Sequence, residues 1–100
     1  MYYMQKAYEK LHIDAESESV LILGYRVHLT ASEYAVLCAI AKDSGITTER
    51  LLFECFEGKD LKTVNIAVHV YNINKKAHEI TGRRLITGNR KSGYKIVENI

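Results

Sequence analysis

The residue types that carry out enzyme chemistry are present in this 100-residue chain, but they are scattered. The four histidines (His12, His28, His69 and His78) and the two cysteines (Cys38 and Cys55) lack the spacing of a metal site. No Ser/His/Asp grouping, phosphate-binding glycine loop or paired-carboxylate motif occurs either. We therefore expect no catalytic residues, no metal and no cofactor, and a protein that is not an enzyme.

The charged residues are distributed unevenly and suggest a different chemistry. Residues 1–60 carry six basic and ten acidic side chains, a net charge of −4. Residues 61–100 carry eight basic side chains against Glu79 and Glu98, a net charge of +6. A basic C-terminal part in a chain of net charge +2 favours a polyanionic partner, although a solvated basic face is the commoner cause of such a cluster.

The chain shows no sign of a membrane or secreted protein. The N-terminal stretch MYYMQKAYEK has no apolar segment of the kind found in secretory signals. No apolar run approaches the ~20 residues that a membrane span needs. Cys38 and Cys55 are expected to be small buried apolar residues in a reducing compartment. We expect a cytoplasmic protein.

The first third of the chain predicts antiparallel strands followed by a helix. Residues 11–29 contain two or three short β-rich runs, with turns near Ala15–Ser19 and Gly24–Tyr25. Residues 1–10 are a leader or an edge strand. The sequence Thr-Ala-Ser-Glu from position 30 is a capping box, which places the start of a helix there, and the helix should end near Asp43.

Two further helices and a hairpin complete the predicted fold. One helix follows Thr47 as its N-cap, with Leu51, Leu52, Cys55 and Phe56 facing inward. A longer helix covers about residues 61–80, with a core face of Ile66, Val70, Ile73, Ala77 and Ile80 and an opposite face of Val64, Val68, Tyr71, Asn72 and Lys75. Residues 85–97 read as a hairpin whose loop runs from Gly88 to Gly93. The result is an α+β winged helix-turn-helix over residues 11–97, in which the third helix enters a major groove and the hairpin is the wing.

Four motifs, in this order, resemble the C-terminal effector domain of OmpR/PhoB-type response regulators. VHLTASEY at 27–34 is similar to the family's junction between strand and first helix, and ITTERLL at 46–52 to the start of its second helix. NIAVHVYNINKK at 65–76 resembles the recognition helix, and SGYK at 92–95 the end of the wing. The resemblance covers about residues 11–97 and implies a transcription regulator that binds double-stranded DNA at promoters, often as tandem copies on direct repeats. The length accommodates this effector domain without the family's receiver domain.

The candidate DNA contacts lie on the third helix and in the wing. Asparagine reads adenine, valine contacts thymine methyl groups, and lysine and tyrosine bind phosphates. Arg90 occupies a wing position where the family often has an arginine, whereas Lys75 is the only charged residue on the base-reading face. His69 flanks the core arc and is expected to be structural. The predicted DNA-binding residues are Asn65, Val68, Tyr71, Asn72, Lys75, Lys76, Arg90 and Lys91.

One alternative is left open by the sequence. Val64, Val68 and Tyr71 could form an exposed apolar patch, so the same scaffold could be a protein-interaction or dimerisation module with weak or no DNA binding. The expected partners are double-stranded DNA, a second copy of the chain as a dimer or tandem neighbour, and RNA polymerase or a receiver domain.

Overall fold

The computed structural model describes residues 10–57 and 64–97. Its elements follow the order β1 (Leu11–Asp14), β2 (Ser19–Ile22), β3 (Tyr25–Val27), α1 (Ala31–Lys42), α2 (Thr48–Phe56), α3 (Ile66–Thr81), β4 (Ile86–Asn89) and β5 (Gly93–Ile96). The predicted α+β winged helix-turn-helix, with N-terminal strands, three helices and a C-terminal hairpin, is confirmed. The prediction for residues 1–10 lies almost entirely outside the described residues.

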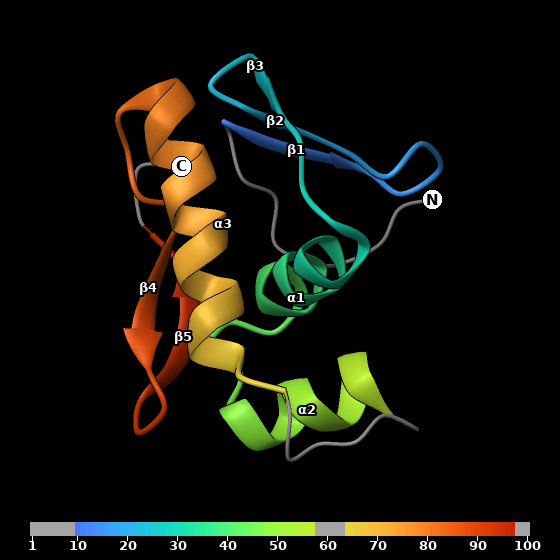
Figure 1. Cartoon of the computed structure of the whole chain (residues 1–100), viewed down its shortest axis with the longest axis vertical. Coiled ribbons are helices and arrows are strands. Elements are labelled where there is room, and N and C mark those ends of the chain that lie inside the picture. The colour runs from blue at the N-terminus through green and yellow to red at the C-terminus, as the bar shows by residue number, and fades with distance from the viewer. Residues whose placement is uncertain (1–9, 58–63, 98–100) are drawn as a thin grey trace.

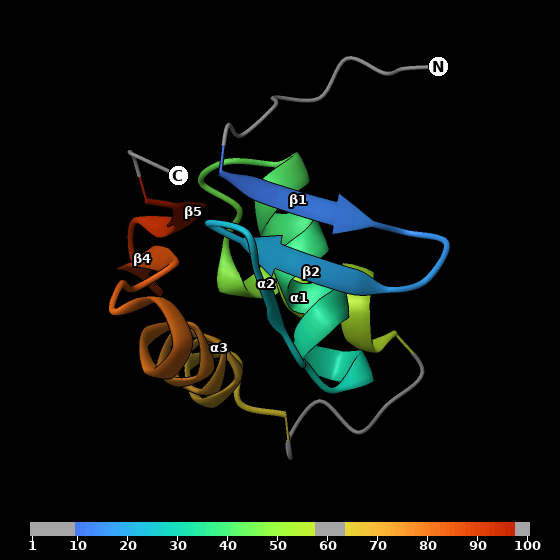
Figure 2. The same ribbon diagram turned by 90° about the horizontal axis from the view of Figure 1, so that it is seen from above.

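The N-terminal strands form an antiparallel sheet in the order β1-β2-β3, which crosses over α1 (Figure 2). The Asp14 carboxylate braces the first turn by accepting hydrogen bonds from the Glu16 N–H (3.1 Å) and the Ser17 hydroxyl (2.8 Å). These bonds stabilise the ionised carboxylate and lower the pKa of Asp14. The second turn lies at Leu23 and Gly24, both with positive φ, one residue earlier than predicted.

The helices begin and end where local chemistry predicts. Thr30 accepts a hydrogen bond from the Glu33 N–H (3.2 Å), and the Glu33 carboxylate accepts one from the Thr30 N–H (3.0 Å), which completes the capping box of α1. Thr47 caps α2, as expected. Gly82 ends α3 with φ +75, a left-handed conformation that favours glycine.

The third helix differs from the prediction at its start and in the burial of one residue of its last turn. It begins at Ile66, because Asn65 is its N-cap, so Val64 and Asn65 precede the helix rather than lie within it. Residues 61–63, where the predicted helix begins, are outside the described residues. Ile80 was expected in the core but is 42% exposed, since it belongs to the last turn of α3, beyond the buried Ala77.

One apolar core unites both sheets and all three helices. Its completely buried side chains include Leu37, Ile40, Leu51 and Ile73. The wing packs beside α3, and α2 lies at the end of the molecule away from the N-terminal sheet (Figure 1). The core therefore fixes α3 and the wing relative to each other.

Candidate nucleic-acid interface

The outward face of α3 presents apolar, polar and basic side chains. Val68 is 50% exposed and Tyr71 is 64% exposed, and Lys75 is exposed one turn further on. These positions follow one another at helical spacing, so they share one face, opposite Val70 and Ile73. Asn72 is half-buried beside them. The structure thus brings together four of the predicted contact residues.

The start of α3 places Asn65 at the edge of this face. Its side-chain oxygen accepts a hydrogen bond from the Val68 N–H at 3.2 Å, so Asn65 caps the helix. Val64 was expected to be exposed, but it is half-buried and packs against the core because it lies before the helix begins. The exposed apolar pair on this surface is therefore Val68 and Tyr71.

The wing presents two cations on a tight turn. The Asn89 carboxamide oxygen accepts hydrogen bonds from the backbone N–H groups of Lys91 and Ser92, both at 2.9 Å. Gly88, Asn89 and Gly93 belong to the strands, so the turn is shorter than the predicted loop of residues 88–93. Arg90 and Lys91 are exposed at its tip.

Asn74 connects α3 to the wing. Its side-chain oxygen accepts hydrogen bonds from the N–H groups of Leu85 (3.0 Å) and Ile86 (2.8 Å), and its amide donates to the Ile86 carbonyl (3.0 Å). These bonds satisfy the backbone groups that are buried where β4 begins. Asn74 therefore sets the angle at which the wing leaves α3.

The loop before α2 is attached to the other strand of the wing. The Gly45 N–H donates to the Tyr94 carbonyl (2.8 Å), and the Tyr94 N–H donates to the Ile46 carbonyl (2.9 Å). This bridge brings the first turn of α2 close to the wing tip, where Arg90 and Glu49 form an ion pair at 3.2 Å. Sequence reasoning missed Glu49, because 41 residues separate it from its partner.

A hollow of about 290 Å³ opens where α2, α3 and the wing meet. The residues that line it are Thr48, Leu52, Val64, Asn65, Ile66, Ala67, Arg90 and Tyr94. The buried hydroxyl of Thr48 has no hydrogen-bond partner among the described residues. The predicted contacts Asn65 and Arg90 thus border one concave region between the helix and the wing.

Lys76 forms an ion pair within the protein. Its ammonium group lies 2.6 Å from the Glu33 carboxylate, and the Lys76 side chain is 35% exposed while that of Glu33 is 5% exposed. The sequence predicts Lys76 at a phosphate, but this pair holds the lysine against the start of α1. The contact was not predictable locally, since the two residues lie 43 positions apart.

The Glu33–Lys76 pair makes the fold sensitive to acid. Burial alone raises the pKa of Glu33, but hydrogen bonds from Lys76 and the Thr30 backbone outweigh it, so the pKa falls below its ordinary value of 4.5. A lowered folded-state pKa stabilises the fold above pH 4.5, and this contribution is lost as the pH falls through the folded-state value.

We expect the urea midpoint of Glu33→Gln to depend less on pH than that of the wild type between about pH 5 and pH 2. The amide retains an oxygen for the Thr30 N–H, so the helix cap is preserved while the titrating group is removed. Equal pH dependence of the two proteins would contradict the role of this pair.

His69, Cys38 and Cys55 have structural roles within the fold. His69 is half-buried and stacks on Phe56, with ring centroids 5.3 Å apart, as expected of a structural residue. Both thiols are free and half-buried. Burial raises the pKa of Cys38, and that of Cys55 to about 11, so both are protonated at neutral pH and poorly nucleophilic.

Residues 10–57 and 64–97 contain no group of three or more His, Cys, Asp or Glu side chains placed to hold a metal ion. No helix in the same ranges has the length and apolar character needed to cross a bilayer.

Solved structures with the same fold come from response regulators. The DNA-binding domain of the response regulator AdeR, solved in complex with an intercistronic region, has a TM-score of 0.73 at 26% identity and covers 91% of this chain and 96% of that chain. The DNA-binding domain of CpxR from E. coli has a TM-score of 0.73 at 19% identity, covering 98% of this chain and 100% of that one.

A third neighbour comes from a family of redox sensors in the streptococci that evolved from two-component response regulators. It has a TM-score of 0.77 at 22% identity, and the match covers 99% of this chain but only 44% of that protein. No protein-family model and no curated protein matches the sequence. The structural neighbours nevertheless confirm the resemblance seen in the motifs, and this chain has the winged-helix fold of the DNA-binding domains of OmpR/PhoB-type response regulators.

Proposed function

We propose that the chain is the DNA-binding domain of a transcription regulator and acts on double-stranded DNA. The helix α3 enters the major groove, and the wing lies on the adjacent minor groove or the backbone. The observation that carries this proposal is the placement of the exposed face of α3 and the Arg90 turn on one rigid scaffold, joined by Asn74. Two neighbours of this fold, the AdeR and RstA domains, were solved with DNA.

The chemistry of the surface favours backbone contacts over base reading. Lys75, Arg90 and Lys91 supply exposed positive charge for phosphates, and Tyr71 adds a hydroxyl. Val68 offers a methyl contact for thymine, and Asn65 and Asn72 offer amides. Lys76 contributes through its pairing with Glu33, which positions α3, rather than as a direct contact. The domain acts by binding and not by catalysis.

We expect Arg90→Ala to weaken binding to a duplex about ten-fold and to lower the salt slope by about one, because one cationic contact is lost. The measurement is fluorescence anisotropy with labelled duplex from a random-sequence selection. Arg26→Ala is the matched control, since it removes the same charge from the N-terminal sheet at the other end of the molecule (Figure 1). Equal losses in both variants would contradict the wing contact.

A protein-interaction function is the second candidate, favoured by the exposure of Val68 and Tyr71. If no duplex binds at physiological salt while Tyr71→Ala abolishes self-association, this second function replaces the first. Under the first function, binding as a dimer or on direct repeats would raise the affinity of a surface poor in arginine, because linked contacts add avidity. We place such a regulator in the cytoplasm, with RNA polymerase or a receiver domain as further partners.

A further inference from the structure

We propose that Glu49 is an internal counter-ion for the wing: it holds Arg90 against the start of α2 and thereby lowers the affinity of the domain for DNA. This inference rests on the proposed function. Arg90 Nη2 lies 3.2 Å from Glu49 Oε2, and the side chains are 73% and 65% exposed. Arg90 is therefore paired within the protein at the surface where it is expected to meet a phosphate.

The backbone places this pair, so it is not a chance meeting of two flexible side chains. The bridge between Ile46 and Tyr94 anchors the loop before α2 to β5. Glu49 follows three residues after that bridge, in the first turn of α2. On the other side, the Asn89 side chain braces the turn that carries Arg90. Both partners thus project from segments that are fixed relative to each other.

The position of Glu49 at the start of α2 also favours a negative side chain there. A carboxylate in the first turn of a helix is stabilised by the helix dipole, so Glu49 is favoured there even without Arg90. The Glu49 carboxylate therefore stays in place when Arg90 leaves it, and it continues to compete with DNA phosphates for the Arg90 guanidinium. Each time Arg90 moves to a phosphate, the Glu49 charge loses its partner.

Binding to DNA therefore carries an exchange cost. The guanidinium fork that binds a carboxylate also binds a phosphate, so the two anions compete for the same donors. Were both to share Arg90, two negative groups would lie within a few ångströms of each other and repel. The pair is exposed, so its strength is modest and falls with salt.

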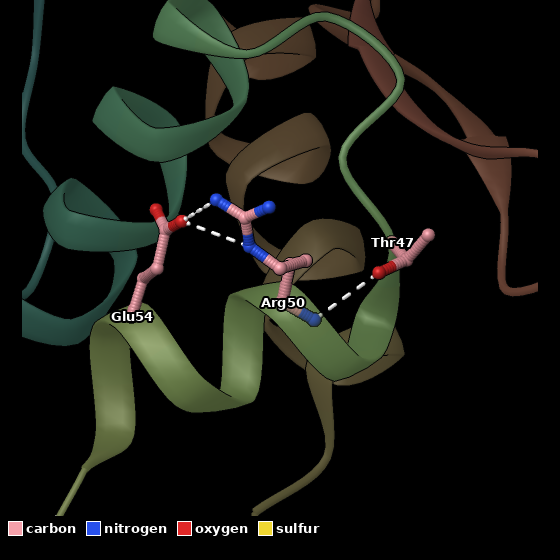
Figure 3. Close-up of polar contacts among 3 residues, drawn as sticks. All are labelled: Thr47, Arg50 and Glu54. Carbon is pink, nitrogen blue, oxygen red and sulfur yellow. Dashed lines mark hydrogen bonds and ion pairs between the residues drawn. The ribbon is translucent and has the colours of Figure 1, made fainter.

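The test compares Glu49→Gln with Glu54→Gln in a duplex titration at low salt. Glu54 is a matched control, because it too lies on α2 and pairs with an arginine. Its partner is Arg50, on the same helix, rather than Arg90 in the wing (Figure 3). Both substitutions change the net charge by the same amount. We expect Glu49→Gln to bind about two- to five-fold more tightly than the wild type. Glu54→Gln should gain less than half of that. Thermal unfolding of each variant verifies that the fold is intact.

A second pair of variants separates restraint of Arg90 from simple repulsion of DNA by Glu49. In an Arg90→Ala background, Glu49→Gln should give no gain, because the cation that Glu49 restrains is absent. A gain that persists there, or equal gains in the two single variants, would overturn the counter-ion assignment while leaving the proposed function intact. If neither the wild type nor Glu49→Gln binds any duplex, both the proposed function and this inference are wrong.

Discussion

Replacing Gly93 with alanine should destabilise the domain by about 3 kcal/mol and detach the wing from the loop before α2. Gly93 has φ +82, and a Cβ at this position would lie 2.3 Å from the carbonyl oxygen of Gly45. The neighbouring atom is backbone, and it belongs to the loop that pairs with Tyr94, so it cannot move without breaking that bridge. Urea unfolding measures the loss.

Gly24→Ala is the control for this substitution. Gly24 has a nearly identical φ of +84, but a Cβ there would meet nothing within 4 Å. Alanine at position 24 should therefore cost only the conformational strain, about 1 kcal/mol. The difference between the two variants isolates the close approach of wing and loop. Equal destabilisation would contradict the claim that this approach is what requires glycine at position 93.

Asn74→Ala should cost about 2–4 kcal/mol, because it leaves the N–H groups of Leu85 and Ile86 and the Ile86 carbonyl without their partner. Both residues are 1% exposed, so water cannot easily replace the lost bonds. DNA affinity should also fall, since the wing loses its fixed angle to α3. Urea unfolding and duplex titration test the two effects.

Asn72→Ala is the matched control, since it makes the same chemical change two residues earlier on the same helix. Asn72 is half-buried on the outward side of α3, so its replacement should change the unfolding free energy by less than about 1 kcal/mol. A comparable loss of stability in both variants would contradict the role of Asn74 as the link between helix and wing.

Local chemistry was sufficient to predict most of the elements. The capping box at Thr30 and Glu33, the cap at Thr47 and the stop at Gly82 each satisfy backbone groups within a few residues, so the sequence displays them directly. The predicted start of α3 near residue 61 is wrong, because the Asn65 side chain caps the helix and α3 begins at Ile66.

The contacts between elements could not be predicted in the same way. Asn74 satisfies the backbone at Leu85 and Ile86, and Lys76 pairs with Glu33, yet both look like polar surface residues of a helix. The partners of Arg90 and Lys76 lie 41 and 43 positions away, so no local pattern indicates them. These long-range pairs show that two of the predicted DNA contacts also have partners within the protein: Lys76 pairs with Glu33, and Arg90 pairs with Glu49.

The central claim is that α3 and the wing bind duplex DNA through their exposed cations, and the most direct test is a titration of a random-sequence duplex at two salt concentrations. Lys75, Arg90 and Lys91 are the exposed cations that we propose to meet phosphates. Three phosphate contacts predict that affinity falls about forty-fold between 50 and 200 mM salt. Absence of binding at the lower concentration, or binding that is insensitive to salt, would contradict the claim.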